Sequence, residues 1–121
     1  MESALEVVNR FYDACNNKQG QGMRDYIADE IVFEGPVLKI TGGDKYVEIV
    51  EPLCKFHGGI RMFKQFEDAG YIPSIYEMTL STPSGKILKI SFADWITVRN
   101  GRIVEQKLYY DPREFVKEFN I

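Results

Sequence analysis

Apolar and polar residues alternate most regularly between residues 86 and 99. From position 88 to position 98 the even-numbered residues are apolar with a single exception, and the apolar set is Leu88, Ile90, Phe92, Ile96 and Val98. Because a strand places successive side chains on opposite faces, this pattern predicts a long strand with one buried face. Asn100-Gly101 follows, and this dipeptide favours the type I′ hairpin turn, in which both central residues need positive φ. Residues 86–112 therefore predict two long strands joined by a tight turn.

Asp94 is the exception on the apolar face of that strand. A buried carboxylate is costly unless it is neutralised, paired or hydrogen-bonded. Two interpretations stay open. Asp94 is either a functional acid or a structural aspartate. In the structural case it accepts hydrogen bonds from tyrosine or backbone donors, or it lies at the solvent-filled opening of a barrel. Lys89 and Arg99 fall on the opposite face, so loss of hydration dominates. We expect Asp94 to face a cavity, with a raised pKa and a largely protonated carboxyl near neutral pH.

The first half of the chain has the three- and four-residue spacing of helices. Ser3 and Glu6 form a capping box, and the helical stripe after it consists of Leu5, Val8, Phe11, Tyr12 and Cys15. Tyr12 is either the edge of this stripe or a phenol that points into a cavity. A short helix at 23–28, a short strand at 31–34 and an extended piece at 37–40 follow. A second helix is expected from Thr41, which is the candidate for its cap, to the glycines after His57.

The second half predicts strands at 60–67 and 71–82, before the central strand. The register between the last two is open. In one register Tyr76 and its even-numbered neighbours share the face of Asp94; in the other Glu77 does. The apolar pattern favours Tyr76, so Glu77 is a conditional catalytic candidate. Asp111-Pro112 has the residue pattern of a helix start, with Asp111 as the cap.

Composition limits the functional classes. The 121 residues fit a single domain, 1–121, and a net charge of −3 with scattered basic residues argues against nucleic acid as a partner. No apolar run approaches the length needed to span a bilayer, and the start of the chain lacks signal-peptide features, so we expect a cytoplasmic protein. Cys15 and Cys54 are expected to be buried thiols. We expect no metal and no cofactor, since His57 is the sole histidine and no metal-ligand motif is present.

Helices followed by long antiparallel strands predict an α+β fold in which a curved antiparallel sheet wraps the N-terminal helices. The enclosed cone has an apolar interior, which suits an apolar small molecule.

Four segments carry a family resemblance. They are Val-Asn-Arg-Phe-Tyr-Asp at 8–13, Asp-Tyr-Ile-Ala-Asp-Glu-Ile-Val-Phe-Glu-Gly-Pro at 25–36, Asn-Gly-Arg-Ile at 100–103 and Tyr-Tyr-Asp-Pro-Arg-Glu-Phe at 109–115. In order and spacing they resemble the nuclear transport factor 2-like superfamily, which includes ketosteroid isomerases, limonene-type epoxide hydrolases and SnoaL-like polyketide cyclases. The resemblance implies a cone-shaped α+β barrel covering nearly the whole chain.

Asp94, seven residues before Gly101, resembles the protonated oxyanion-hole aspartic acid of the isomerases. The position of the isomerase base is Gly35 here, and the phenolic donor falls on Phe11, one residue before Tyr12.

The Asp–Arg–Asp set of the epoxide hydrolases corresponds to Glu77, Ile75 and Leu108, and the acid/base aspartate of the cyclases also falls near Leu108. The resemblance therefore implies only part of each known catalytic set.

Two hypotheses follow. The first is an enzyme that transfers protons next to a carbonyl group in an apolar substrate, with Asp94, Glu77 and Tyr12 as catalytic candidates. The expected substrate contacts are Phe33, Val50, Phe92, Gln106, Leu108 and Tyr110. The second is a non-catalytic module that binds an apolar ligand or dimerises. In either case the apolar outer face around Trp95 and Tyr109 predicts a homodimer.

Overall fold

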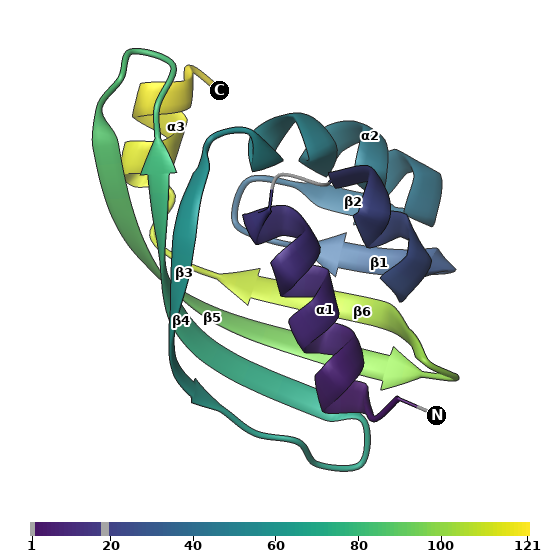
Figure 1. The fold of residues 1–121 in the computed structure, drawn as a ribbon. Coiled ribbons are helices and arrows are strands. Elements are labelled where there is room, and N and C mark those ends of the chain that lie inside the picture. The colour runs from purple at the N-terminus through teal and green to yellow at the C-terminus, as the bar shows by residue number, and fades with distance from the viewer. Residues whose placement is uncertain (1, 18–19) are drawn as a thin grey trace.

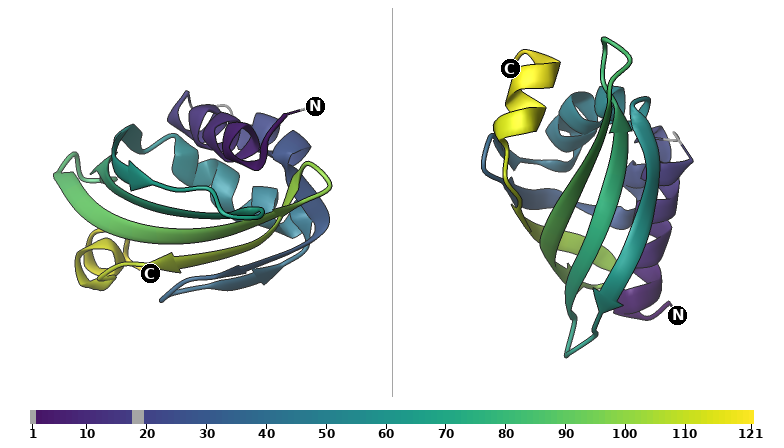
Figure 2. Two further views of the ribbon diagram at one scale, coloured as in Figure 1. Left: turned by 90° about the horizontal axis from the view of Figure 1, so that it is seen from below. Right: turned by 90° about the vertical axis from the view of Figure 1, so that its left-hand side faces the viewer.

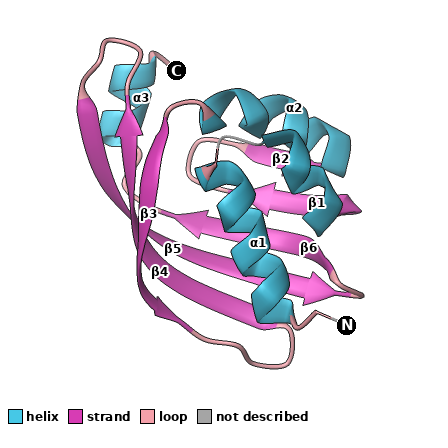
Figure 3. Ribbon diagram, in the orientation of Figure 1, coloured by secondary structure: helices cyan, strands magenta, loops and turns pink. Residues whose placement is uncertain are grey.

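The computed structural model describes residues 2–17 and 20–121 (Figures 1 and 3). Within them the chain forms helices and strands in the order α1 (Ala4–Asn16), η1 (Gly20–Tyr26, a 3₁₀ helix), β1 (Ile27–Glu34), β2 (Lys39–Thr41), α2 (Gly43–Cys54), β3 (His57–Gln65), β4 (Tyr71–Ser81), β5 (Ile87–Arg99), β6 (Arg102–Tyr109) and α3 (Arg113–Phe119). Among the described residues, no helix is long and apolar enough to cross a membrane.

The strands form one six-stranded sheet in the order β2-β1-β6-β5-β4-β3. The sheet is strongly curved, and the helices other than α3 lie on its concave side (Figures 1 and 2). The predicted α+β barrel is therefore confirmed. The sheet is mixed rather than purely antiparallel, because β1 pairs in parallel with β6. The hairpin fixes β5 on one side of β6, and the other edge of β6 is left for β1, which arrives from the first half of the chain.

The strand and turn pattern of the central hairpin forms as the sequence predicts. Asn100 and Gly101 both have positive φ, 53° and 75°, as the tight turn requires. The even-numbered side chains of β5 from Leu88 to Val98 are buried. They face α1, which has the predicted capping box of Ser3 and Glu6. The buried residues of α1 are Val7, Val8, Phe11, Tyr12 and Ala14.

Several boundaries differ from the sequence pattern. A 3₁₀ helix replaces the short α-helix expected at 23–28, and β1 begins four residues early, at Ile27. The residue before α2 is Gly42, with a φ of 102°, rather than Thr41. Pro112 rather than Asp111 precedes α3; the Asp111 carboxylate instead accepts a bond from the Arg113 backbone N–H.

His57 also departs from the expectation. The sequence pattern placed His57 at the end of the second helix, whereas His57 begins β3 and pairs with Leu80 of β4. Its inward orientation in the strand leaves only 4% of the residue exposed.

Candidate functional site

Asp94 lies at the centre of a buried polar cluster on the concave face of the sheet. Its side chain is only 2% exposed. On β5 it sits between Phe92 and Ile96, and its strand neighbours are Ser74 on β4 and Leu108 on β6. Alternation along the strand therefore turns this carboxylate into the interior, as the sequence pattern predicts.

Hydrogen bonds converge on one oxygen of the Asp94 carboxylate. Oδ2 accepts bonds from the hydroxyl of Tyr12 at 2.8 Å, from Nε2 of Gln106 at 3.0 Å and from the hydroxyl of Tyr76 at 3.2 Å. Tyr46 extends the cluster, since its hydroxyl donates to Oε1 of Gln106 at 2.8 Å. The other oxygen, Oδ1, is buried and has no hydrogen-bond partner among the described residues.

The four other residues of the cluster come from separate elements. Tyr12 is on α1, Tyr46 on α2, Tyr76 on β4 and Gln106 on β6. Ring packing orients two of them: the rings of Tyr12 and Tyr76 meet edge to face at 5.3 Å between centroids. Because each phenol has an apolar body and a polar tip, each can join the core while its hydroxyl reaches Asp94.

Burial raises the pKa of Asp94 to about 6, and the hydrogen bonds from Tyr12, Gln106 and Tyr76 oppose the rise by stabilising the ionised carboxylate. The direction agrees with the sequence-based expectation. The degree does not, because with this pKa most Asp94 is ionised rather than protonated near neutral pH. The sequence showed the apolar strand face but not the donors on neighbouring elements.

The pKa values of the tyrosine hydroxyls are raised as well. Burial raises the pKa of Tyr12 and of Tyr76 well above the usual value, and the negative charge of Asp94 raises both further. Both phenols therefore stay protonated and act as hydrogen-bond donors.

A cavity of about 150 Å³ adjoins this cluster and is lined by residues of the sheet, of α1 and of α2, and by Phe115 of α3. The six expected substrate contacts, Phe33, Val50, Phe92, Gln106, Leu108 and Tyr110, all line it. Tyr12 and Tyr76 also line it, whereas Asp94 does not. Asp94 is therefore buried behind the residues that line the cavity, contrary to the expectation that it faces the cavity itself; its partners Tyr12, Tyr76 and Gln106 are among those lining residues.

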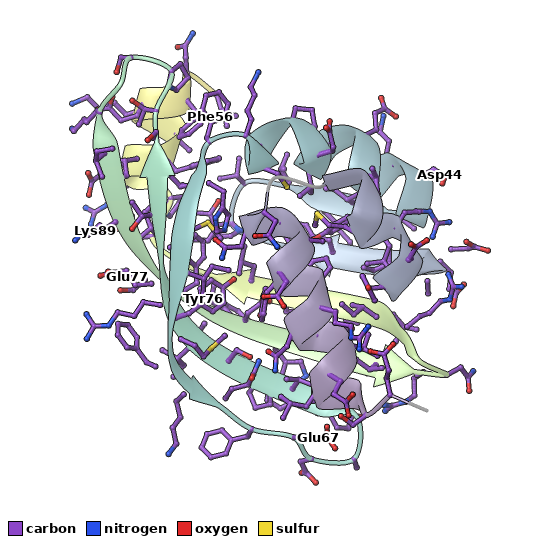
Figure 4. The ribbon with its side chains drawn as sticks, viewed as in Figure 1. Asp44, Phe56, Glu67, Tyr76, Glu77 and Lys89 are labelled. Carbon is purple, nitrogen blue, oxygen red and sulfur yellow. The ribbon has the colours of Figure 1, made fainter. Side chains whose placement is uncertain are left out.

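Glu77 lies outside this site. It pairs with Ser91 across β4 and β5, in the register that places Tyr76 on the side of Asp94. Figure 4 shows the consequence: Tyr76 lies on the side of the sheet that faces the helices, and Glu77 points away on the other side. Because side chains alternate with period two, the conditional placement of Glu77 in the cavity is wrong.

Other cavity residues were not singled out from the sequence. Tyr46 looked like one more apolar position in a helical stripe, and His57 like a helix end. Cys15 and Cys54 line the same cavity. No spacing signal could have brought these residues together, since they lie on elements that meet only when the sheet curls around α1. Among the residues the structure describes, no group of three or more His, Cys, Asp or Glu is arranged to hold a metal ion.

The family model of the SnoaL-like domain matches residues 8–106 of this chain. This protein belongs to the SnoaL-like domain family. The match includes β1, β5 and every residue of the Asp94 cluster, whereas the cavity residues Leu108, Tyr110 and Phe115 lie beyond it. The fold of this protein is shared with a solved structure described as nuclear transport factor 2-like. A search of curated protein sequences finds no significant match.

Solved structures share the fold of this SnoaL-like protein at low sequence identity. A nuclear transport factor 2-like protein of unknown function from Cytophaga hutchinsonii is 20% identical with a TM-score of 0.79, over 95% of this chain and 96% of that one. A protein from Bacillus subtilis described as a candidate isomerase is 18% identical with a TM-score of 0.85, over 97% and 92%. A candidate SnoaL-like polyketide cyclase from Mesorhizobium loti is 17% identical with a TM-score of 0.71, over 90% and 100%.

Proposed function

We propose that this SnoaL-like protein binds a small apolar carbonyl compound in its cavity and promotes proton transfer next to the carbonyl group. The observation that carries the proposal is that Tyr12 and Tyr76 both line the cavity and both donate a hydrogen bond to the buried Asp94. An apolar cavity of about 150 Å³ accommodates a molecule of roughly one aromatic ring. The substrate class is therefore a one-ring or short-chain ketone or enone rather than a steroid.

In the mechanism we propose, Asp94 controls the direction of the tyrosine hydroxyls. When it is ionised, Oδ2 accepts the protons of both Tyr12 and Tyr76. When it is protonated, its own proton is donated to one hydroxyl oxygen, and the proton of that hydroxyl turns towards the cavity. It can then hydrogen-bond to the carbonyl oxygen of the substrate as negative charge develops there. A donor fixed in such a dry site stabilises an oxyanion by roughly 3–4 kcal/mol.

The mechanism has a pH dependence of defined sign. The form with protonated Asp94 is the competent one, so activity is present below the pKa of Asp94, about 6, and falls as the pH rises through it. The structures described as a candidate isomerase and a candidate cyclase share this fold. Those descriptions belong to those proteins, and they support the proposal only through the shared fold.

One observation favours a second candidate function, the binding of an apolar ligand without catalysis. Among the described residues, no Asp or Glu lines the cavity. The structure thus offers donors for a carbonyl oxygen but no carboxylate base for the adjacent carbon. In that case Tyr12, Tyr76 and Gln106 would fix the orientation of a bound carbonyl ligand.

Acetophenone labelled with ¹³C at its carbonyl carbon tests both candidates. We expect it to bind, and its carbonyl resonance to move downfield on binding because a hydroxyl donates to the oxygen. The shift should be larger at about pH 5 than at about pH 8, on either side of the pKa of about 6. Tyr12→Phe or Tyr76→Phe should reduce it, and the matched control Glu77→Gln, on the outer face, should leave it unchanged.

Two outcomes count against the proposal. If no member of a panel of one-ring apolar ketones binds, the cavity does not have the ligand class proposed. If acetophenone binds but the resonance is the same in the wild type and in both tyrosine variants, the hydroxyls do not contact the carbonyl. Turnover then distinguishes the two functions: exchange of the α-hydrogens of acetophenone for deuterium, above the rate without protein, indicates catalysis, and its absence supports binding alone.

We also infer that two copies of the chain pair through the outer face of the sheet. Ile75, Ala93 and Tyr109 are direct neighbours in a row across β4, β5 and β6, and Trp95 lies two residues from Ala93 on the same face. Three of these side chains are large, apolar and more than 40% exposed: Ile75, Trp95 and Tyr109. A continuous apolar patch on a sheet favours a symmetric contact with a second copy.

A further inference from the structure

Cys15 and Cys54 are the two cysteines of the sequence. They lie 39 residues apart, yet their Sγ atoms are separated by only 3.1 Å. Cys15 is in the last turn of α1, and Cys54 is the last residue of α2. Figure 1 shows these two helix ends side by side above the sheet. A disulfide bond is about 2.05 Å long, so an approach of about 1 Å by two side chains would complete one.

The two thiols differ in their surroundings. The Cys15 thiol hydrogen-bonds to Cys54, and this bond lowers the pKa of Cys54, although burial and the charge of Glu51 oppose the effect. The same bond, with burial, raises the pKa of Cys15. Cys54 is therefore the thiol that ionises first, and a thiolate is the nucleophilic form of cysteine. Cys15 remains a protonated neighbour within reach.

Both sulfurs also have access to small molecules. Cys15 and Cys54 line the cavity, and Cys15 is partly exposed. Met23 lies on the other side of Cys54, with its Sδ atom 3.6 Å from the Cys54 Sγ atom. The pair thus sits on an apolar wall that a small uncharged oxidant such as hydrogen peroxide can reach.

We propose that Cys15 and Cys54 form a redox-active dithiol that a peroxide converts to an intramolecular disulfide joining the ends of α1 and α2. The Cys54 thiolate attacks one oxygen of hydrogen peroxide, the O–O bond breaks, and hydroxide leaves, giving a sulfenic acid on Cys54. The sulfur of Cys15 then attacks the Cys54 sulfur, the S–O bond breaks, and the proton of Cys15 leaves with the oxygen as water. In sum, two thiols and one peroxide give one disulfide and two waters.

The disulfide would have a structural consequence at the cavity. It links the two helices that cover the concave face and closes a loop between residues 39 positions apart. Closing such a loop restricts the unfolded chain, which stabilises the folded state. The bond would also remove the thiolate from the cavity wall. This inference does not depend on the proposed carbonyl chemistry, since neither Asp94 nor its partners take part.

The test uses the full chain, reduced and then freed of reductant. It is treated with a small excess of hydrogen peroxide and then unfolded in the presence of iodoacetamide, which alkylates free thiols. Its mass is measured by intact mass spectrometry. We expect untreated protein to gain two alkyl groups and treated protein to gain none and to weigh two hydrogens less. Peptide mapping should join the peptides of Cys15 and Cys54. The treated protein should melt several degrees higher, and dithiothreitol should reverse the shift.

Single variants separate the two roles. In Cys15→Ser we expect the sulfenic acid of Cys54 to persist and to be trapped by dimedone. In Cys54→Ser we expect Cys15 to react more slowly with the same peroxide than Cys54 does in the wild type, because burial still raises the pKa of Cys15 after its partner thiol is removed. Thermal unfolding of both reduced variants checks that they fold; should either fail to fold, the wild-type mass measurement decides alone. Treated wild-type protein that still gains two alkyl groups, carries a sulfinic acid, or is linked between two chains would overturn the proposal.

Discussion

The hydroxyl of Tyr12 on α1 donates a 2.8 Å hydrogen bond to Oδ2 of Asp94 on β5, across 82 residues of sequence. This bond joins the first helix to the middle of the sheet at the wall of the cavity. It also opposes the effect of burial on the carboxyl, because a donor stabilises the ionised form. The chemistry of the site and the stability of the fold are therefore coupled through one carboxylate.

Replacing Asp94 by Asn should change how stability depends on pH. The folded state raises the pKa of Asp94 from 3.8 to about 6, so its stabilising contribution is complete below the unfolded-state value and is lost as the pH rises through about 6. A rise of this size corresponds to about 3 kcal/mol. Asp94→Asn lacks that loss of stability with rising pH, and its amide oxygen can still accept hydrogen bonds from two of the three donors. We expect the variant to be more stable than the wild type at alkaline pH.

Urea unfolding at about pH 5 and about pH 8 measures this difference across the pKa. Asp94→Leu is the matched comparison, because it removes the charge and also the acceptor, leaving Tyr12, Tyr76 and Gln106 without their partner. It should be less stable than Asp94→Asn at both values. Equal pH dependence in the wild type and in Asp94→Asn would show that Asp94 does not titrate as a buried group.

Replacing Tyr12 by Phe should raise the pKa of Asp94 further. The variant removes the hydrogen bond that lowers this pKa most, and Tyr76→Phe removes one with a smaller effect. We therefore expect the pKa to exceed about 6 in both variants, and more so in Tyr12→Phe. A titration followed at the carboxyl carbon by NMR measures it, with the exposed Tyr109→Phe as control. A lower pKa in either variant would contradict the assigned hydrogen bonds.

Removing the carboxylate of Glu77 should have no effect on the cavity. Glu77→Gln and Asp94→Asn make the same chemical change on opposite faces of the sheet. We expect the affinity for acetophenone and the pKa of Asp94 to be the same in Glu77→Gln as in the wild type. Calorimetry and the carboxyl titration provide the two measurements. A weaker affinity in Glu77→Gln would mean that this side chain reaches the ligand by a route that the register excludes.

Replacing Trp95 by Glu should separate the expected dimer into monomers. Trp95 is 42% exposed and lies in the apolar patch with Tyr109. A charge placed there would lose its hydration in a symmetric contact, so the interface should weaken. Light scattering of the wild type should give twice the chain mass of 14.0 kDa, and Trp95→Glu should approach 14.0 kDa. Lys45→Glu, on α2, is the charge-changing control. A wild type of 14.0 kDa would refute the dimer.

Local sequence patterns determined most of the fold. The two-residue alternation from Leu88 to Val98 specified the buried face of β5, and Asn100-Gly101 specified the turn that follows it. The capping box at Ser3 specified the start of α1. These features depend on backbone geometry and on side-chain spacing within a few residues, which is why they can be recognised in one sequence. The isolation of Asp94 on an apolar face is of the same kind.

Contacts between distant segments decided the rest. The pairing of β1 with β6, the placement of Glu77 outside and the meeting of Cys15 with Cys54 all depend on how the sheet curves around α1. The ionisation of Asp94 belongs to this group as well. Its apolar strand neighbours are visible in the sequence, but the donors that limit its pKa to about 6 come from α1, β4 and β6. The sequence by itself determined that a carboxyl would be buried there. The tertiary structure decided how many hydrogen-bond donors reach this carboxyl, because only folding brings donors from distant elements within 3.2 Å of it.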